Sequence, residues 1–121
     1  AAPHLKKCGG CIISIADIYG DGPRIGYLIY SVAKAGVIML TKALARELGP
    51  EIRVNAIAPG VILWPENDLD EMSKQRIISR TPLKRSGDTD DVARTALFLI
   101  RDAGFITGQV LSVSGGYSTI R

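Results

Sequence analysis

The sequence has little of what several classes of protein need. Its 121 residues include two cysteines, one histidine and one tryptophan. Two cysteines do not build a disulfide-stabilised scaffold, so a reducing, cytoplasmic location is expected. No apolar run reaches the ~18–20 residues that cross a membrane, and no charged start followed by an apolar run marks a signal peptide. We therefore expect a cytoplasmic protein with no membrane partner.

Charge of one sign is not concentrated either. The net charge is +3, from 15 basic and 12 acidic residues. The basic residues are scattered, without a stripe or tail and without interleaved aromatic residues, so no nucleic-acid partner is expected. The length allows one domain with a moderate core.

The scarcity of histidine and cysteine also limits metal binding. His4, Cys8 and Cys11 lie close together in the chain, and Cys-x-x-Cys can bind zinc or act as a redox pair. A four-coordinate site needs another ligand, and no other histidine or cysteine exists. We therefore expect no metal, and expect Cys11 to point into the sheet as a small apolar residue.

What the chain does contain is an alternation of short apolar runs and helical patterns. The runs at 11–16, 52–58 and 109–114 have the length and composition of buried strands. Because helical patterns separate them, parallel strands with right-handed crossovers are expected. Three strands make a thin sheet with a bare edge, and the opening AAPHLKK resembles the end of a helix. The sequence therefore predicts the second half of a larger α/β domain.

Three helices are predicted between these strands. One covers 27–48 and ends at Gly49-Pro50, and a mostly polar one covers 70–80. Asp88 is expected to cap the third at its N-terminus. The expected core face of this third helix consists of Val92, Ala93, Ala96, Leu97 and Ile100.

The residues 30–34, YSVAK, are a candidate site. On a helix Tyr30 and Lys34 share one face, and Asp17 lies 13 residues before Tyr30 at the predicted carboxyl end of the first strand. Ligands of open parallel sheets bind beyond the carboxyl ends of the strands. We expect these residues to converge there with Pro59-Gly60, which follows the second strand. Tyr-x-x-x-Lys alone is common by chance, and Asp17 alone could form an Asx turn.

The pair suggests acid catalysis. A free phenol has a pKa of ~10 and is a poor proton donor at neutral pH. The ammonium of Lys34 is expected to stabilise the phenolate and lower the pKa of Tyr30. Tyr30 could then deliver a proton while a cofactor delivers hydride, and Lys34 could also hold a ribose hydroxyl.

Three stretches, YSVAK, AGVIMLTKALARELGPEIRVNAIAPG and FITGQVLSVSGGY, resemble the short-chain dehydrogenase/reductase family. The resemblance implies a Rossmann-type, doubly wound α/β fold, of which residues 1–121 would be the C-terminal, catalytic half, without the dinucleotide-binding half. It implies a catalytic set of Asp17, Tyr30 and Lys34. It implies a cofactor, NADPH, held by Tyr30, Lys34, Pro59 and Gly60. It further implies a homo-oligomer, tetrameric at full length, and an inactive isolated chain.

The departures from the family pattern indicate a branch. Asp17 stands where most members have serine, and Ser14 is not that serine because it lies 16 residues before Tyr30. Trp64 stands near where many members have threonine. SIAD, GYLIYSVAK, APGVILWPE and GGYSTIR resemble the pteridine reductases. This resemblance implies reduction of a dihydropterin or dihydrofolate to the tetrahydro form, with Tyr30 as proton donor.

Two alternatives remain open at this point. One is a carbonyl reductase of the 3-oxoacyl type, against which Asp17 argues because a ketone needs a neutral donor at its oxygen. The other is a non-catalytic fragment that keeps the oligomerisation helix at 27–48.

Overall fold

The computed structural model describes residues 1–62 and 69–120. Its helices are α1 (Ala2–Cys8), α2 (Leu28–Leu48), α3 (Glu71–Arg80) and α4 (Thr89–Arg101), with short 3-10 helices η1 (Ile18–Gly20) and η2 (Tyr117–Thr119). Its strands are β1 (Cys11–Ile15), β2 (Arg53–Pro59) and β3 (Val110–Val113). The predicted strands, and the predicted helices at 27–48 and 70–80, are confirmed with ends within one residue.

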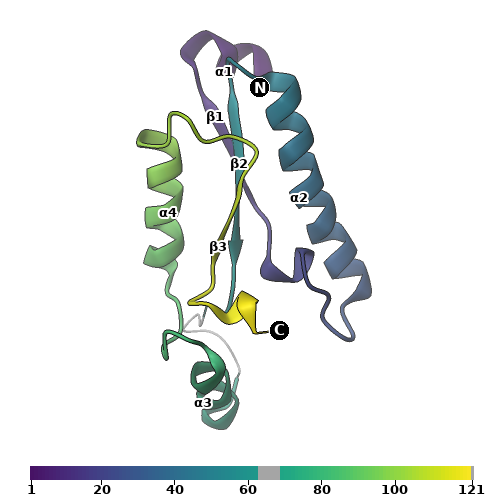
Figure 1. The fold of residues 1–121 in the computed structure, drawn as a ribbon, viewed down its shortest axis with the longest axis vertical. Coiled ribbons are helices and arrows are strands. Elements are labelled where there is room, and N and C mark those ends of the chain that lie inside the picture. The colour runs from purple at the N-terminus through teal and green to yellow at the C-terminus, as the bar shows by residue number, and fades with distance from the viewer. Residues whose placement is uncertain (63–68, 121) are drawn as a thin grey trace.

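The three strands form one parallel sheet in the order β1-β2-β3. Ile13 of β1 pairs with Asn55 of β2, and Ile57 of β2 pairs with Leu111 of β3. α2 lies on one side of the sheet and α4 on the other, and the carboxyl ends of the strands point toward α3 and the C-terminus (Figure 1). The predicted α/β sheet with flanking helices is confirmed.

The central strand β2 carries the core. Val54 and Ile57 have no exposed surface, and each faces a different helix because side chains alternate along a strand. Val54 packs with Ala45 of α2, whereas Ile57 packs with Leu99 of α4. Full burial of one such side chain stabilises the fold by roughly 1.5–3 kcal/mol, so β2 anchors both layers.

The core face of α4 differs from the predicted one. Leu99 is completely buried, whereas Leu97 and Ile100 are 48% and 55% exposed, and Ala93 is also exposed. Val92 and Ala96 pack in the same cluster as Leu99 and Ala103. Residues 92, 96 and 99 follow the helical repeat and define the buried stripe of α4, and Ala103 extends the cluster just beyond the end of the helix. Three of the predicted residues, Ala93, Leu97 and Ile100, therefore lie beside the buried stripe and not in it.

The helix α2 corrects a second expectation. The helix has 21 residues, and an 18-residue window of it has a mean hydropathy of 1.5, so it is long and apolar enough to cross a membrane by length and composition alone. The same test is passed by helices that pack in a protein core. α2 packs on the sheet through the buried residues Thr41 and Ala45, and it carries Lys34 and Lys42.

Polar side chains hold the amino-terminal half of β2 in place. The side-chain amide of Asn55 donates to the Ile106 carbonyl (2.9 Å) and accepts from the Gln109 N–H (3.0 Å). Arg53 donates to the carbonyls of Leu99 and Ala103 at the end of α4. These bonds join β2 to the segment before β3 and to the end of α4, so they fix the amino-terminal half of β2 in the sheet.

Candidate active site

Asp17 is positioned by the turn that follows β1. It precedes η1, and its Oδ1 accepts a hydrogen bond from the Tyr19 N–H at 2.8 Å, which is an Asx turn. Gly20 brings η1 close to α2, because a Cβ at this position would lie 2.9 Å from the backbone of Lys34. The turn therefore seats Asp17 against the helix that carries Tyr30.

Asp17 and Tyr30 meet as expected from their spacing. The hydroxyl of Tyr30 donates to Asp17 Oδ2 at 2.7 Å. Both carboxyl oxygens of Asp17 are thus engaged, one by the turn and one by the phenol. Asp17 forms the Asx turn and the contact with Tyr30 at the same time, although these were considered as alternatives.

Lys34 lies beside this pair but is directed to the sheet. Its Nζ donates to the carbonyl oxygen of Ile15, the last residue of β1, at 3.1 Å. It lies 5.7 Å from the centroid of the Tyr30 ring. The ammonium therefore ties α2 to the carboxyl end of β1 and faces the ring of Tyr30.

The pKa of Tyr30 shifts in the direction opposite to the predicted one. Desolvation, followed by the hydrogen bond to Asp17 and the charge of Asp17, raises the pKa of Tyr30 to about 12. The charge of Arg24 acts in the other direction. The prediction that Lys34 lowers this pKa is wrong for this arrangement, because a carboxyl accepts from the hydroxyl while Lys34 binds the Ile15 carbonyl.

A cavity of about 470 Å³ opens at the carboxyl ends of the strands. Tyr30, Asp17 and Gly60 line it. Gly60 allows β2 and β3 to converge, because a Cβ there would lie 2.5 Å from the Cβ of Ser114. Pro59 ends β2 beside Val113 of β3 and is not among the lining residues. Trp64 and the other residues of 63–66 in the APGVILWPE match lie outside the described residues.

The loop before α2 contributes residues to the site that were not predicted from the sequence. Arg24 and Tyr27 line the same cavity, and the guanidinium carbon lies 4.3 Å from the centroid of the Tyr27 ring. The available signal was Tyr27 three residues before Tyr30, which places both rings near the start of one helix. Their centroids are 6.3 Å apart in an edge-on arrangement.

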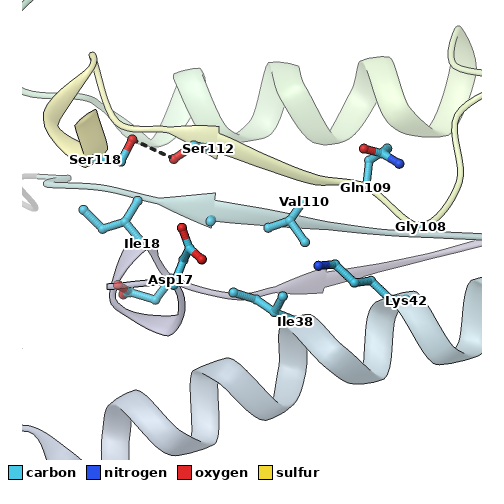
Figure 2. A pocket seen from close by; sticks show the side chains of 11 residues that line it. Asp17, Ile18, Ile38, Lys42, Gly108, Gln109, Val110, Ser112 and Ser118 are labelled. Atoms are coloured by element: carbon cyan, nitrogen blue, oxygen red, sulfur yellow. Dashed lines mark hydrogen bonds between the residues drawn. The ribbon is translucent and has the colours of Figure 1, made fainter. Parts of the chain in front are cut away.

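A second hollow, of about 370 Å³, lies between the sheet and α2. Ile38 and Lys42 of α2 face Val110 and Ser112 of β3 across it, and Asp17 lies at the end opposite to Lys42 (Figure 2). Ser112 is engaged by Ser118 at 3.3 Å. Tyr30 does not line this hollow, and Lys34 lines neither this hollow nor the cavity with Tyr30. The cavity that contains Tyr30 is the candidate active site.

The residues considered for metal binding form no cluster. Cys8 is exposed and Cys11 is partly buried, and both are free thiols. Within residues 1–62 and 69–120, no three side chains of histidine, cysteine, aspartate or glutamate gather as a metal would require.

Comparison with known proteins finds a family match, similar sequences and similar solved structures. Residues 1–118 match the family model described as "Enoyl-(Acyl carrier protein) reductase". The chain belongs to the short-chain dehydrogenase/reductase family. It is 41% identical over 115 residues to 3-oxoacyl-[acyl-carrier-protein] reductase FabG of Thermotoga maritima, covering 93% of this chain and 47% of that protein. The chain spans about half the length of the curated relatives it matches.

Two solved structures place the fold among Rossmann-type enzymes of this family. A 7α-hydroxysteroid dehydrogenase complexed with NADH and 7-oxo glycochenodeoxycholic acid has a TM-score of 0.87 and 37% identity, covering 95% of this chain and 47% of that one. ElxO with NADP bound has a TM-score of 0.86 and 39% identity, covering 97% and 50%. The membership of the short-chain dehydrogenase/reductase family predicted from the sequence is therefore confirmed. The names of these relatives match the carbonyl reductase alternative better than pterin reduction.

Proposed function

We propose that the complete protein is an NAD(P)H-dependent reductase that converts a carbonyl group of a small molecule to an alcohol. The observation that carries this proposal is the hydrogen bond between Tyr30 and Asp17 in one cavity at the carboxyl ends of the strands, with Lys34 5.7 Å from the Tyr30 ring centroid. A reductase named for a 3-oxoacyl substrate and a dehydrogenase bound to a 7-oxo steroid support it.

The residues at the site fit a dinucleotide. One donor of the Lys34 ammonium is used by the Ile15 carbonyl, and an ammonium has two more that can reach ribose hydroxyls. Gly60 offers a backbone surface without a side chain at the edge of the cavity. When bound, the dinucleotide supplies the hydride. We propose that Tyr30, Lys34, Pro59 and Gly60 hold it and that NADPH is the form used.

The raised pKa keeps Tyr30 protonated at neutral pH, as a donor must be. The hydroxyl proton now points at Asp17 and can turn to a carbonyl oxygen placed within hydrogen-bond distance of Tyr30. As hydride adds to the carbonyl carbon, the Tyr30 O–H bond breaks and an O–H bond forms on the substrate. An alkoxide is a stronger base than a phenolate, so the transfer is downhill even at a pKa of about 12. Solvent in the cavity returns a proton to Tyr30.

The test uses protein expressed from its complete coding sequence. Oxidation of NADPH and of NADH is followed with a 3-oxoacyl thioester, a cyclic ketone and a dihydropterin as separate substrates. We expect turnover of a carbonyl substrate, with a higher kcat/KM for NADPH than for NADH. Absence of cofactor oxidation with every carbonyl compound would reject the proposal. Absence of oxidation with all three substrates is the result expected for the non-catalytic alternative.

Pterin reduction is a second candidate, favoured by Asp17. A pterin ring offers N–H donors that a carboxyl can accept, whereas a ketone offers none. If the substrate is a pterin, Asp17→Ser abolishes dihydropterin reduction while ketone reduction holds or rises. If both activities change alike, Asp17 has a structural role and the pterin assignment loses its main support.

The predicted homo-oligomer remains a proposal. Val32, Met39 and Leu40 of α2 are 64%, 63% and 54% exposed, and the sequence resemblance implies that this helix meets a second copy. Light scattering of the complete protein would test it, with Met39→Lys expected to lower the molar mass. An unchanged monomer in both proteins would reject it.

A further inference from the structure

Arg24 places a positive charge in the cavity that contains Tyr30. Its guanidinium carbon lies 4.3 Å from the centroid of the Tyr27 ring and 5.4 Å from that of the Tyr19 ring. All three residues line the cavity. A cation over an aromatic face is attracted by the ring quadrupole. The two rings therefore hold the guanidinium in a defined place, although the side chain belongs to an exposed loop.

Arg24 borders two hollows, and its contacts indicate which of them the guanidinium faces. Arg24 also borders a mostly apolar hollow of about 400 Å³ between its loop and the first turns of α2. Tyr27 lines only the cavity with Tyr30, and Tyr19 lines both. The guanidinium lies closer to Tyr27 than to Tyr19. The charge is thus on the side of Tyr30.

The charge in this cavity has no protein carboxylate as its partner among residues 1–62 and 69–120, where no salt bridge to Arg24 forms. Asp17 shares the cavity, but its two oxygens accept from Tyr19 and Tyr30. Of the described lining residues, only Arg24 is a cation. Its field reaches the reacting group, because it acts to lower the pKa of Tyr30.

We propose that Arg24 binds a carboxylate of the substrate, so that the enzyme reduces oxo acids whose carbonyl oxygen is held at Tyr30. This inference rests on the proposed carbonyl reduction at the same site. A guanidinium presents paired N–H donors that match a carboxylate, and such pairs are among the stronger hydrogen bonds in proteins. The Tyr27 ring touches both Arg24 and Tyr30, so it sets the separation between the two ends of the substrate.

The test compares 4-oxopentanoate with its methyl ester in the complete protein. We expect kcat/KM to be at least ~10-fold higher for the acid. Arg24→Gln should lower kcat/KM for the acid by roughly 10- to 100-fold, mainly through KM, because the carboxylate is bound equally in the ground and transition states. Arg24→Lys should keep a preference for the acid. Equal turnover of acid and ester by the unmodified protein would overturn the inference.

Arg94→Gln is the matched control. Arg94 lies on α4 with an 81% exposed side chain and pairs with Asp90. The substitution therefore removes one positive charge at a position outside the cavity. It should leave the acid-to-ester ratio unchanged, and thermal unfolding of each variant checks that the fold persists. A ratio that falls as far in Arg94→Gln as in Arg24→Gln would attribute the preference to net charge and overturn the inference.

A binding measurement separates this inference from the proposed function. Calorimetric titration of 4-oxopentanoate, in the presence of NADP⁺, needs no turnover. Binding that Arg24→Gln weakens by at least ~10-fold supports the carboxylate site even if no carbonyl is reduced. Absence of binding, or binding that Arg24→Gln leaves unchanged, overturns it.

Discussion

Polar side chains near the two ends of the central strand β2 differ in burial and in hydrogen-bond partners. Near its amino end, Asn55 is 1% exposed and Arg53 is partly buried, and backbone groups of other segments satisfy their side chains. At the carboxyl end, Tyr30 is 41% exposed, borders a cavity and bonds to another side chain. Backbone partners cannot exchange for a ligand without unfolding, whereas a hydroxyl at a cavity can. The first end therefore holds the fold and the second is available for chemistry.

The largest expected effect is on catalysis at the carboxyl end. Tyr30→Phe removes the proton donor and should lower kcat by at least ~10²-fold, which is about 2.7 kcal/mol in the barrier. Steady-state kinetics with the best carbonyl substrate measures it. Thermal unfolding should change little, since one exposed hydrogen bond is lost. Activity within a few-fold of the unmodified protein would remove Tyr30 from this role.

The next effect is on stability near the amino end. Asn55→Ala leaves the Ile106 carbonyl and the Gln109 N–H without their partner, and should destabilise the fold by about 2 kcal/mol. Denaturant unfolding measures the free energy of unfolding, with the exposed Gln75→Ala on α3 as control. If Asn55→Ala were as stable as Gln75→Ala, the comparison between the two ends would fail.

A smaller effect is expected where a polar pair at the carboxyl end is structural. Asp88 accepts from the Asp91 N–H at 2.8 Å and Asp91 accepts in return from the Asp88 N–H, a capping box that begins α4. Asp88→Ala should cost about 1 kcal/mol of stability. Asp88→Asn, which can still cap, should cost less. Kinetic constants should be unchanged in both, and a loss of activity at full stability would show that this cap has a role beyond structure.

The smallest effect is a shift in titration. Because the pKa of Tyr30 is raised from 10.0 to about 12, its contribution to stability is complete below the unfolded pKa and is lost as pH rises through about 12. The phenolate absorbance of the unmodified protein, minus that of Tyr30→Phe, reports this titration. Asp17→Asn removes the negative charge and should lower the pKa. A pKa that stays unchanged in Asp17→Asn would assign the whole shift to desolvation.

Local patterns in the sequence were sufficient for the elements and for the central pair of the site. The strands 11–16 and 52–58 and the helix 27–48 were predictable because periodicity and turn residues act over a few neighbours. The convergence of Asp17 and Tyr30 followed from strand direction, since ligand sites of parallel sheets gather at the carboxyl ends. Both depend on near neighbours and on general rules of topology.

The tertiary structure alone decided the direction of the Tyr30 pKa, the buried stripe of α4 and the place of Arg24. Lys34 was within one helical turn of Tyr30 in sequence, yet its partner is the Ile15 carbonyl, 19 residues away. Leu99 is buried because β2 lies against that side of α4. Arg24 faces Tyr27 through a local turn, in which the Tyr27 N–H donates to the Arg24 carbonyl, but its second ring, Tyr19, comes from η1 on the other side of the loop. Desolvation, packing and charge depend on what lies across space, and a residue's neighbours along the chain do not specify that.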